Sequence, residues 1–287
     1  MTQTNGPGYE LPILRIVPVE ALVPHEQHDD QRSGPLIEKM RESGVLKNPP
    51  IVAPFSPDDP ADGRYVVLDG ANRSTAARVA GLPHMVVQVV RYEDPSIQLS
   101  TWHHALVGVR HADIERALEA LPGLVTRGDE LRHARAVLAR REALAYLVHA
   151  RGRTFTLHGG GDLHQRNALL NAVVDSYRDR TRFYRVASDS LTQARRRYPD
   201  ATALVVFPRF EPAEILELAG TGARLPAGIT RHLIPWRALR INVPLEVLAD
   251  KKPSLEEKNR WLSDWLSQRV TQRRVRFYEE STVLFDE

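Results

Sequence analysis

The sequence predicts an α+β protein with an N-terminal domain over residues 1–105 and a C-terminal α/β domain over residues 106–287. Short apolar runs rich in β-branched residues alternate with amphipathic helical segments along the whole chain. A chain of 287 residues can bury a large core and suits one large or two modest domains. No low-complexity linker separates the two halves, so we expect them to pack together.

The composition excludes several classes of protein. The sequence contains no cysteine, which excludes disulfides, thiolate metal sites and thiol catalysis. No apolar run approaches the ~20 residues of a membrane helix, and residues 1–10 lack the basic and apolar regions of a signal peptide. A cytoplasmic protein without a membrane partner is therefore expected. The net charge of +3 suits anionic ligands but is too small to indicate nucleic-acid binding, and it leaves the oligomeric state open.

The N-terminal elements follow from short patterns. Apolar β-type runs predict the strands, and helical spacing predicts the helices, the first with Ser33 as its cap and Pro35 in its first turn. The predicted strands cover residues 11–17, 51–53, 65–68 and 85–90, and the predicted helices cover residues 33–43 and 74–80. Their order predicts a compact α+β unit.

One segment of this unit combines a strand, a turn and a helix. Gly70 follows the strand and permits a tight turn, after which small residues begin the helix. Unpaired N–H groups at a helix N-terminus form an anion site, most often for phosphate. Arg73 adds a guanidinium that can bind phosphate through two hydrogen bonds, and Asp69 can bind a metal or orient a hydroxyl. The local pattern alone equally fits a structural turn capped by Asp69, with Arg73 in solvent.

Asp69-Gly70-x-x-Arg73 before a small-residue helix resembles the phosphate-binding signature of the ParB/sulfiredoxin superfamily. Together with Asn48-Pro49-Pro50 and Pro24-His25-Glu26, it is most similar to the free L-serine kinases of that superfamily. These enzymes make O-phospho-L-serine, and one is encoded with siderophore biosynthesis. The absence of cysteine excludes sulfiredoxin chemistry. The resemblance covers residues 11–102, with a second segment near residues 226–245, and it makes the N-terminal domain ParB/sulfiredoxin-like.

The resemblance implies roles for residues of the N-terminal domain. Glu26 takes the place of the catalytic acidic residue, although by itself its segment fits a solvated loop better. Asp69 would orient the acceptor hydroxyl or hold Mg²⁺, and Trp102 would border the serine pocket or, alternatively, pack against the domain. The residues expected to bind the nucleotide phosphates are Gly70, Ala71, Asn72, Arg73 and Ser74. Asn72 stands where many relatives carry histidine, which leaves the donor nucleotide open.

A second polar group lies in the C-terminal half. Thr230, Arg231 and His232 are consecutive between apolar residues and offer a hydroxyl, a guanidinium and an imidazole to an anion. The resemblance implies that they bind the serine substrate, and an exposed strand edge is the alternative. Around them, the patterns predict helices over residues 112–121, 127–150, 163–180, 190–198, 211–219 and 255–270, and strands over residues 182–187, 203–208 and 237–244, with a strand pair over residues 273–285. Residues 159–161 are expected to form a hairpin turn, since they lack the Lys-Ser/Thr ending of a Walker loop.

The leading hypothesis is therefore a kinase that phosphorylates free L-serine, with ATP or ADP as donor, Mg²⁺ as counter-charge and Glu26 as general base. The alternative is a ParB-like, nucleotide-binding and DNA-associated transcriptional regulator. Such regulators usually carry a helix-turn-helix after the nucleotide domain. Residues 112–150 are predicted to be helical but lack a glycine-centred turn with a polar recognition helix, so nucleic acid is possible but not favoured as a partner.

Overall fold

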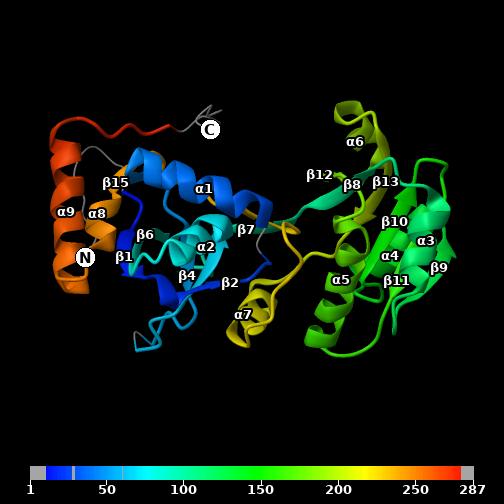
Figure 1. Ribbon diagram of the computed structural model, residues 1–287. Coiled ribbons are helices and arrows are strands. Elements are labelled where there is room, and N and C mark those ends of the chain that lie inside the picture. Colours follow the sequence, from blue (N-terminus) through cyan, green and yellow to red (C-terminus); the bar gives the residue numbers. More distant parts are fainter. Residues whose placement is uncertain (1–10, 28–29, 60, 279–287) are drawn as a thin grey trace.

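The computed structural model describes residues 11–27, 30–59 and 61–278. Two sheets form two lobes that are joined by a narrow middle region (Figure 1). One sheet has five strands and comes from the N-terminal part of the chain, and the other has six strands and comes from the middle. Helices and strands are mixed in both lobes, so the predicted α+β class is confirmed.

The first sheet has the strand order β1-β6-β4-β5-β2. Its strands are β1 (Leu14–Pro18), β2 (Leu22–Pro24), β4 (Ile51–Pro54), β5 (Tyr65–Asp69) and β6 (His84–Val89), and its helical elements are the 3₁₀ turn η1 (Val19–Ala21), α1 (Asp30–Ser43) and α2 (Ala71–Val79). Strands β1, β4, β5 and β6 lie where the sequence predicts them, and β2 lies in a segment for which no strand was predicted. The first predicted helix, α1, begins three residues earlier than expected, at Asp30, so Ser33 lies within it and is not its cap.

The centre of this sheet explains its sequence pattern. Strand β4 lies between β6 and β5, and β5 lies between β4 and β2. A strand that is covered on both faces carries a continuous apolar run. Accordingly Val52, Ala53, Val66 and Val67 are fully buried. Because β5 is held on both sides, the turn that follows it at Gly70 is fixed in place.

The second sheet has the order β12-β8-β13-β10-β11-β9, and its neighbouring strands are antiparallel. Its strands are β8 (His103–Val107), β9 (Val125–Asp129), β10 (Ala145–His149), β11 (Thr154–His158), β12 (Phe183–Val186) and β13 (Ala201–Val206). The helices of this part are α3 (His111–Glu119), α4 (Leu131–Ala139), α5 (Leu163–Arg178), α6 (Leu191–Arg197) and α7 (Pro212–Gly220).

The predicted helix over residues 127–150 is wrong. The segment contains the end of β9, the helix α4 and the strand β10. Arg141 has a positive φ of 63°, which ends the helical path, and the apolar run after it crosses the middle of the sheet. Strand β9 separates α3 from α4, so the segment does not form a helix-turn-helix. Residues 159–161 lead from β11 into α5 and are not the expected hairpin turn.

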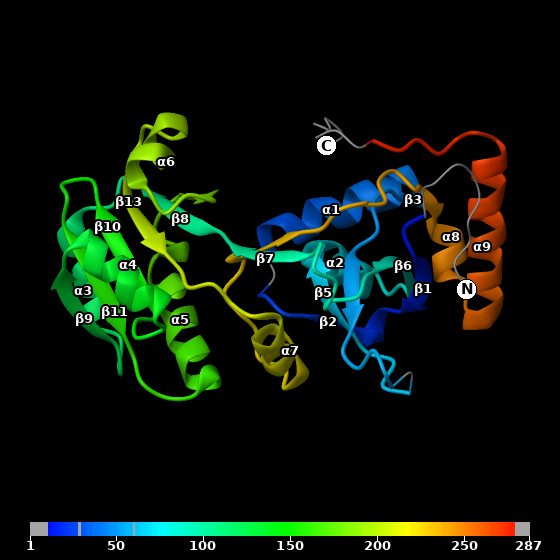
Figure 2. The same ribbon diagram turned by 180° about the vertical axis from the view of Figure 1, so that it is seen from behind.

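The C-terminal part of the chain returns to the first sheet (Figure 2). The elements involved are β3 (Val45–Leu46), β7 (Gln98–Thr101), β14 (Thr230–Leu233), β15 (Val243–Pro244), α8 (Leu245–Ala249) and α9 (Leu255–Thr271). Strand β14 pairs with β7 and β15 with β3, while Asn259 of α9 exchanges two hydrogen bonds with the backbone of Ile16 in β1. These contacts place residues 230–271 against the N-terminal part of the chain. The domain boundary at residue 105 stays a prediction.

Two predicted strands near the C-terminus differ from the structure. Of residues 237–244, only the last two form a strand, because Arg240 and Asn242 both have a φ of 51° and interrupt the extended path. The described residues 273–278 contain no strand, and residues 279–285 of the predicted pair lie outside the described residues. None of the helices in the described part of the chain is both long and apolar enough to cross a bilayer.

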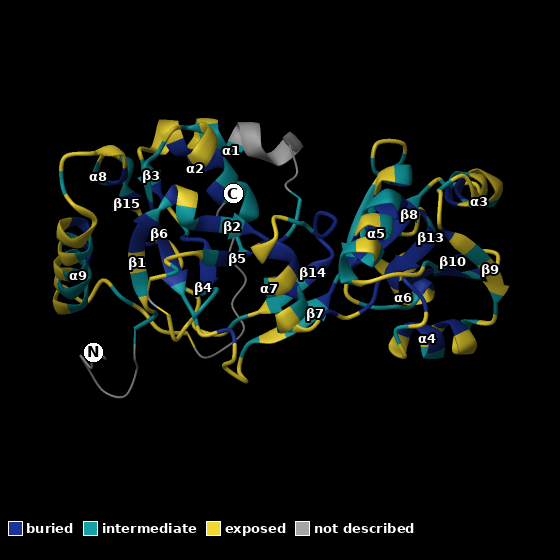
Figure 3. Cartoon of the chain, turned by 90° about the horizontal axis from the view of Figure 1, so that it is seen from below, coloured by how far each residue is buried: buried dark blue, intermediate teal, exposed yellow. Residues whose placement is uncertain are grey.

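The two sheets share one core. A single buried cluster contains Ala53, Val66 and Leu68 of the first sheet together with Leu147 and Val205 of the second. Figure 3 shows buried residues running through the middle region between the lobes. Burial of this apolar surface stabilises the contact between the lobes and therefore fixes the geometry of groups that approach each other there.

Candidate active site

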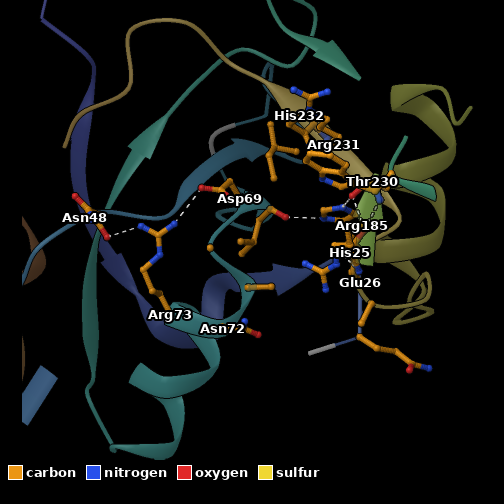
Figure 4. A pocket seen from close by; sticks show the side chains of 18 of the residues that line it. His25, Glu26, Asn48, Asp69, Asn72, Arg73, Arg185, Thr230, Arg231 and His232 are labelled. Atoms are coloured by element: carbon orange, nitrogen blue, oxygen red, sulfur yellow. Dashed lines mark hydrogen bonds and ion pairs between the residues drawn. The ribbon is translucent and has the colours of Figure 1, made fainter. Parts of the chain in front are cut away.

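A cavity of about 730 Å³ lies where the first sheet, β14 and β12 meet (Figure 4). It collects side chains from segments that are more than 200 residues apart in the sequence, such as those that contain Glu26 and Gly228. All but one of the predicted site residues line it: Glu26, Asp69, Gly70, Ala71, Asn72, Arg73, Trp102, Thr230, Arg231 and His232. The structure therefore brings the predicted phosphate turn and the predicted serine-binding segment to one place.

Ser74 is the exception. It is only 2% exposed, its hydroxyl donates to the Ala71 carbonyl at 2.9 Å, and its N–H donates to the Gly70 carbonyl at 3.0 Å. Its N–H is thus already used in the first bond of helix α2, as expected for the fourth residue of a helix. We correct the prediction that Ser74 contacts phosphate.

The turn at Gly70 has the geometry of an anion site. Gly70 has a φ of 95° and precedes helix α2, which begins without a side-chain cap among the described residues. A Cβ on Gly70 would lie 3.0 Å from Pro50 and from the guanidinium of Arg73. The first turn of α2 lines the cavity, so the positive end of its dipole faces the space where an anion would bind.

Replacing Gly70 by alanine is expected to weaken nucleotide binding about tenfold, a change of about 1.4 kcal/mol, because the added methyl displaces Arg73 or Pro50. Gly81→Ala is the matched control, since Gly81 follows the same helix with a φ of 70° and no described atom within 4 Å of its added Cβ. Both variants should lose about 1–2 kcal/mol of stability from the positive φ. Denaturant unfolding and nucleotide titration calorimetry separate the two effects, and equal nucleotide affinity in both variants would contradict the role of Gly70.

Arg73 connects the turn to a neighbouring segment. Its Nη1 donates to the Asn48 carbonyl at 2.8 Å, and its Nη2 donates to Asp69 Oδ2 at 3.0 Å. Arg237, from the loop after β14, also contacts Asp69 Oδ2. Two guanidinium groups therefore hold the Asp69 carboxylate at the edge of the cavity, and Arg73 is not a solvated side chain.

Asp69 neither caps helix α2 nor belongs to a preformed metal site. The N-cap of α2 is Gly70, and the described residues contain no group of three or more His, Asp or Glu side chains that could hold a metal ion. Mg²⁺ is commonly bound by one or two carboxylates together with substrate phosphates and waters. Asp69 fits that kind of site, in which the nucleotide would supply the other ligands.

Glu26 is fixed by three hydrogen bonds. Its Oε2 accepts the Gly228 N–H at 2.8 Å, and its Oε1 accepts the Thr230 N–H at 2.6 Å and the Thr230 hydroxyl at 2.5 Å. The backbone is held as well, because Gln27 N–H donates to the Leu225 carbonyl and Leu225 N–H donates to the His25 carbonyl, both at 2.8 Å. The carboxylate is therefore preorganised at the cavity wall, which is what a general base requires.

Thr230 and His232 line the cavity and also make contacts within the protein. The hydroxyl of Thr230 contacts Glu26 and also lies 2.7 Å from His25 Nε2. His232 Nε2 lies 2.8 Å from the Tyr92 hydroxyl. Burial lowers the pKa of His232 to about 3, with a further contribution from His25, so its imidazole is neutral at pH 7. Burial also raises the pKa of Tyr92, which keeps its hydroxyl a donor to this nitrogen.

Arg231 and Arg185 provide positive charge opposite the phosphate turn. The guanidinium of Arg231 lies 4.5 Å from the ring centre of Trp102, in a cation–π contact. Arg185 comes from β12 of the second sheet and packs so closely on Gly228 that a Cβ there would lie 2.0 Å from its Cζ. A side chain at position 228 would therefore displace the Arg185 guanidinium from its present place in the cavity wall.

Sequence reasoning assigned no site role to several other residues that line the cavity, among them the polar residues Lys39, Asn48, Arg185 and Arg237. Asn48 belongs to the Asn-Pro-Pro motif and could have been found from it, because that motif directly precedes a strand of the site. Arg185 and Arg237 carry no local signal, since each reaches the cavity only through the folding of a distant segment.

No family model matches the chain. The chain is 25% identical over 251 residues to the ATP-dependent L-serine kinase of Staphylothermus marinus, which covers 84% of this chain and 95% of the relative. It is 25% identical to the ATP-dependent L-serine kinase SbnI of Staphylococcus aureus, covering 86% and 88%, and 23% identical to the ADP-dependent L-serine kinase SerK of Thermococcus kodakarensis, covering 84% and 97%. The predicted resemblance to free L-serine kinases is confirmed.

Solved structures agree on the fold. A free serine kinase in complex with AMP superposes with a TM-score of 0.69 at 21% identity, covering 84% of this chain and 98% of that one. C-terminally truncated SbnI from Staphylococcus aureus superposes with a TM-score of 0.67 at 23% identity, covering 90% and 97%. The fold of more than four fifths of this chain thus recurs in other proteins.

Proposed function

We propose that this protein is a kinase that phosphorylates free L-serine to O-phospho-L-serine, with ATP or ADP as the phosphoryl donor. The observation that carries the proposal is the Glu26 carboxylate, held by three hydrogen bonds in the same cavity as the uncapped N-terminus of helix α2. The relatives named L-serine kinases, which match over more than four fifths of this chain, support the same activity.

In the proposed reaction, the nucleotide phosphates bind at the first turn of α2, where Lys39, Arg73 and Arg237 add positive charge. Arg231 and Arg185 bind the carboxylate of serine. Glu26 Oε2 takes the proton of the serine hydroxyl, since a carboxylate oxygen can accept more than the single bond from Gly228.

The transfer itself needs mainly positioning and charge. The serine oxygen forms a bond to the terminal phosphorus while the bond from that phosphorus to the bridging oxygen breaks, and the electron pair stays on the shortened nucleotide. Fixed cations that stabilise charge on the transferred group account for most catalysis of this kind. Mg²⁺ held by Asp69 and the nucleotide phosphates would supply further neutralisation.

A DNA-associated regulator is the less favoured function. The helices α3 and α4, which follow the first domain, belong to the six-stranded sheet and are separated by β9. The relatives are named as kinases of a small amino acid. We place the protein in the cytoplasm, where free serine and nucleotides are available.

The test is to incubate the purified protein with L-serine, Mg²⁺ and either ATP or ADP, and to follow the reaction by phosphorus NMR. A new phosphomonoester signal is expected with one of the nucleotides, and it should be absent when L-alanine replaces L-serine, since alanine has no hydroxyl. The nucleotide that gives the signal identifies the donor. No phosphoserine with either nucleotide would contradict the proposal.

A further inference from the structure

We propose that His25, Thr230 and Glu26 act as one hydrogen-bonded unit, in which a doubly protonated His25 directs the Thr230 hydroxyl at Glu26 and so keeps the base in its active form. His25 and Thr230 are positioning residues in this unit. The catalytic consequence rests on the proposed kinase function, whereas the protonation of His25 is a property of the protein by itself.

One contact of the His25 ring shows that its Nδ1 carries a hydrogen. His25 is only 3% exposed, and its Nδ1 lies 2.6 Å from the Val67 carbonyl oxygen. A carbonyl oxygen can only accept a hydrogen bond, so Nδ1 must carry a hydrogen. The other ring nitrogen, Nε2, lies 2.7 Å from the Thr230 hydroxyl oxygen.

The hydroxyl hydrogen of Thr230 then determines whether the second ring nitrogen of His25, Nε2, also carries a proton. The Thr230 oxygen lies 2.5 Å from Glu26 Oε1 and 2.7 Å from His25 Nε2, and its one hydrogen can be donated to only one of them. If His25 were neutral and Glu26 ionised, the hydroxyl could donate to Glu26 Oε1 or to His25 Nε2, but not to both. The other contact would then join two acceptor atoms with no hydrogen between them, which is repulsive.

Two arrangements of the protons place one hydrogen in each contact between His25, Thr230 and Glu26. In the first, His25 carries a hydrogen on both ring nitrogens, Thr230 donates to Glu26, and Glu26 is ionised. In the second, His25 is neutral and Glu26 carries a hydrogen on Oε1, so that Glu26 is a poor base. Glu26 also accepts the N–H groups of Gly228 and Thr230, and such donors favour the charged carboxylate. We therefore infer the first arrangement.

The surroundings are consistent with a charged His25. The His232 ring meets His25 edge to face, with ring centres 5.3 Å apart, and burial keeps the His232 ring neutral, so it adds no second positive charge. Glu26 supplies the compensating negative charge through Thr230. A buried charge is tolerated when it is paired and hydrogen-bonded, and all three groups of this unit meet that condition.

The protonation of His25 can be measured without any catalytic assay. In the full-length protein with ¹⁵N-labelled histidine at pH 7, we expect both ring nitrogens of His25 to show a directly bonded hydrogen by NMR. The signals are assigned by their absence in His25→Gln. A spectrum in which Nε2 carries no hydrogen would overturn the proposal, whether or not the protein phosphorylates serine.

Matched variants test the effect on turnover. We expect Thr230→Val to lower kcat about 100-fold and Thr230→Ser to stay within about threefold of the wild type, with the KM for serine and the nucleotide affinity changed less than kcat in both. His25→Gln, which keeps a donor for Thr230, should retain more turnover than His25→Leu. Turnover of Thr230→Val equal to that of Thr230→Ser would contradict the role of the hydroxyl.

These outcomes separate the two proposals. If the wild-type protein makes no phosphoserine, the proposed function fails while the NMR measurement still decides the state of His25. If the wild type is active and all four variants lose turnover equally, with equal loss of thermal stability, then the contacts serve folding alone and the directed hydroxyl is rejected.

Discussion

Replacing Glu26 by glutamine is expected to lower kcat by about 10²- to 10⁴-fold, with nucleotide binding nearly intact. A glutamine amide keeps the shape of the side chain but cannot take the proton of the serine hydroxyl. The nucleotide phosphates are proposed to bind at the first turn of helix α2 and Arg73, so their affinity does not depend on the charge of Glu26. Phosphorus NMR or a coupled assay gives kcat, and titration calorimetry gives the nucleotide affinity.

The hydrogen bonds of Glu26 add a second expectation. Both carboxylate oxygens accept N–H donors, from Gly228 and from Thr230. The NH₂ group of glutamine must face one of these donors, so one bond is lost and stability should fall by about 1–3 kcal/mol. Glu26→Asp is the matched control, because it keeps the charge but shortens the reach, and we expect it to retain more activity. A glutamine variant with wild-type turnover would remove Glu26 as the base.

The strand, turn and helix around Gly70 could be predicted from the sequence because all their signals are local. A buried strand, a glycine with positive φ and a small-residue helix are contiguous between Tyr65 and Val79, and each depends on residues only a few positions away. Ser74 was assigned wrongly because the helix begins at Ala71, which uses the Ser74 N–H within the helix. One turn of helix thus separates the residues that face the cavity from those that do not.

The contacts around Thr230, Arg231 and His232 were only partly predictable. Thr230, Arg231 and His232 stood out as consecutive polar residues, but their roles depend on partners that the sequence does not place. Thr230 meets Glu26 across 204 positions, and Tyr92 meets His232 across 140. Such pairings are set by how the sheets fold together, so local patterns could not have assigned them. For the same reason, the positions of Arg185 and Arg237 in the cavity could not be predicted from local sequence patterns.

The errors in the predicted elements have a related cause. Strand β10 is a short apolar run beside a helix, and periodicity alone cannot separate such a run from more helix. Its place between β11 and β13 makes it a strand. Residues 237–244 were predicted to form a strand, yet the chain from Trp236 to Asn242 is a loop in which Trp236, Arg240 and Asn242 have positive φ. The Gln88 side chain holds this loop through the Trp236 carbonyl and the Ala238 N–H.

Stability is expected to fall steeply as the pH drops below about 6.5, because three buried histidines are neutral in the folded protein. Burial lowers the pKa of His103 to about 4 and the pKa values of His104 and His232 to about 3, from 6.5. The unfolded chain therefore binds up to three more protons than the folded one between these values. These three histidines leave stability unaffected above pH 6.5, and below that pH they lower it progressively until the folded pKa values are reached.

The size of this effect makes it easy to measure. With nearly three extra protons bound by the unfolded state near pH 5, the free energy of unfolding should change by about 4 kcal/mol per pH unit, which is large beside a typical total of about 5–15 kcal/mol. Thermal unfolding between pH 7.5 and pH 4.5 should show a steep fall in Tm. His104→Phe is the matched variant, because His104 stacks on Phe183 at 4.2 Å, and it should reduce the slope near pH 5 by about a third. A Tm that stays constant down to pH 4.5 would show that these imidazoles are not buried as neutral groups. It would then also contradict the assignment of a neutral imidazole to His232 in the cavity lining.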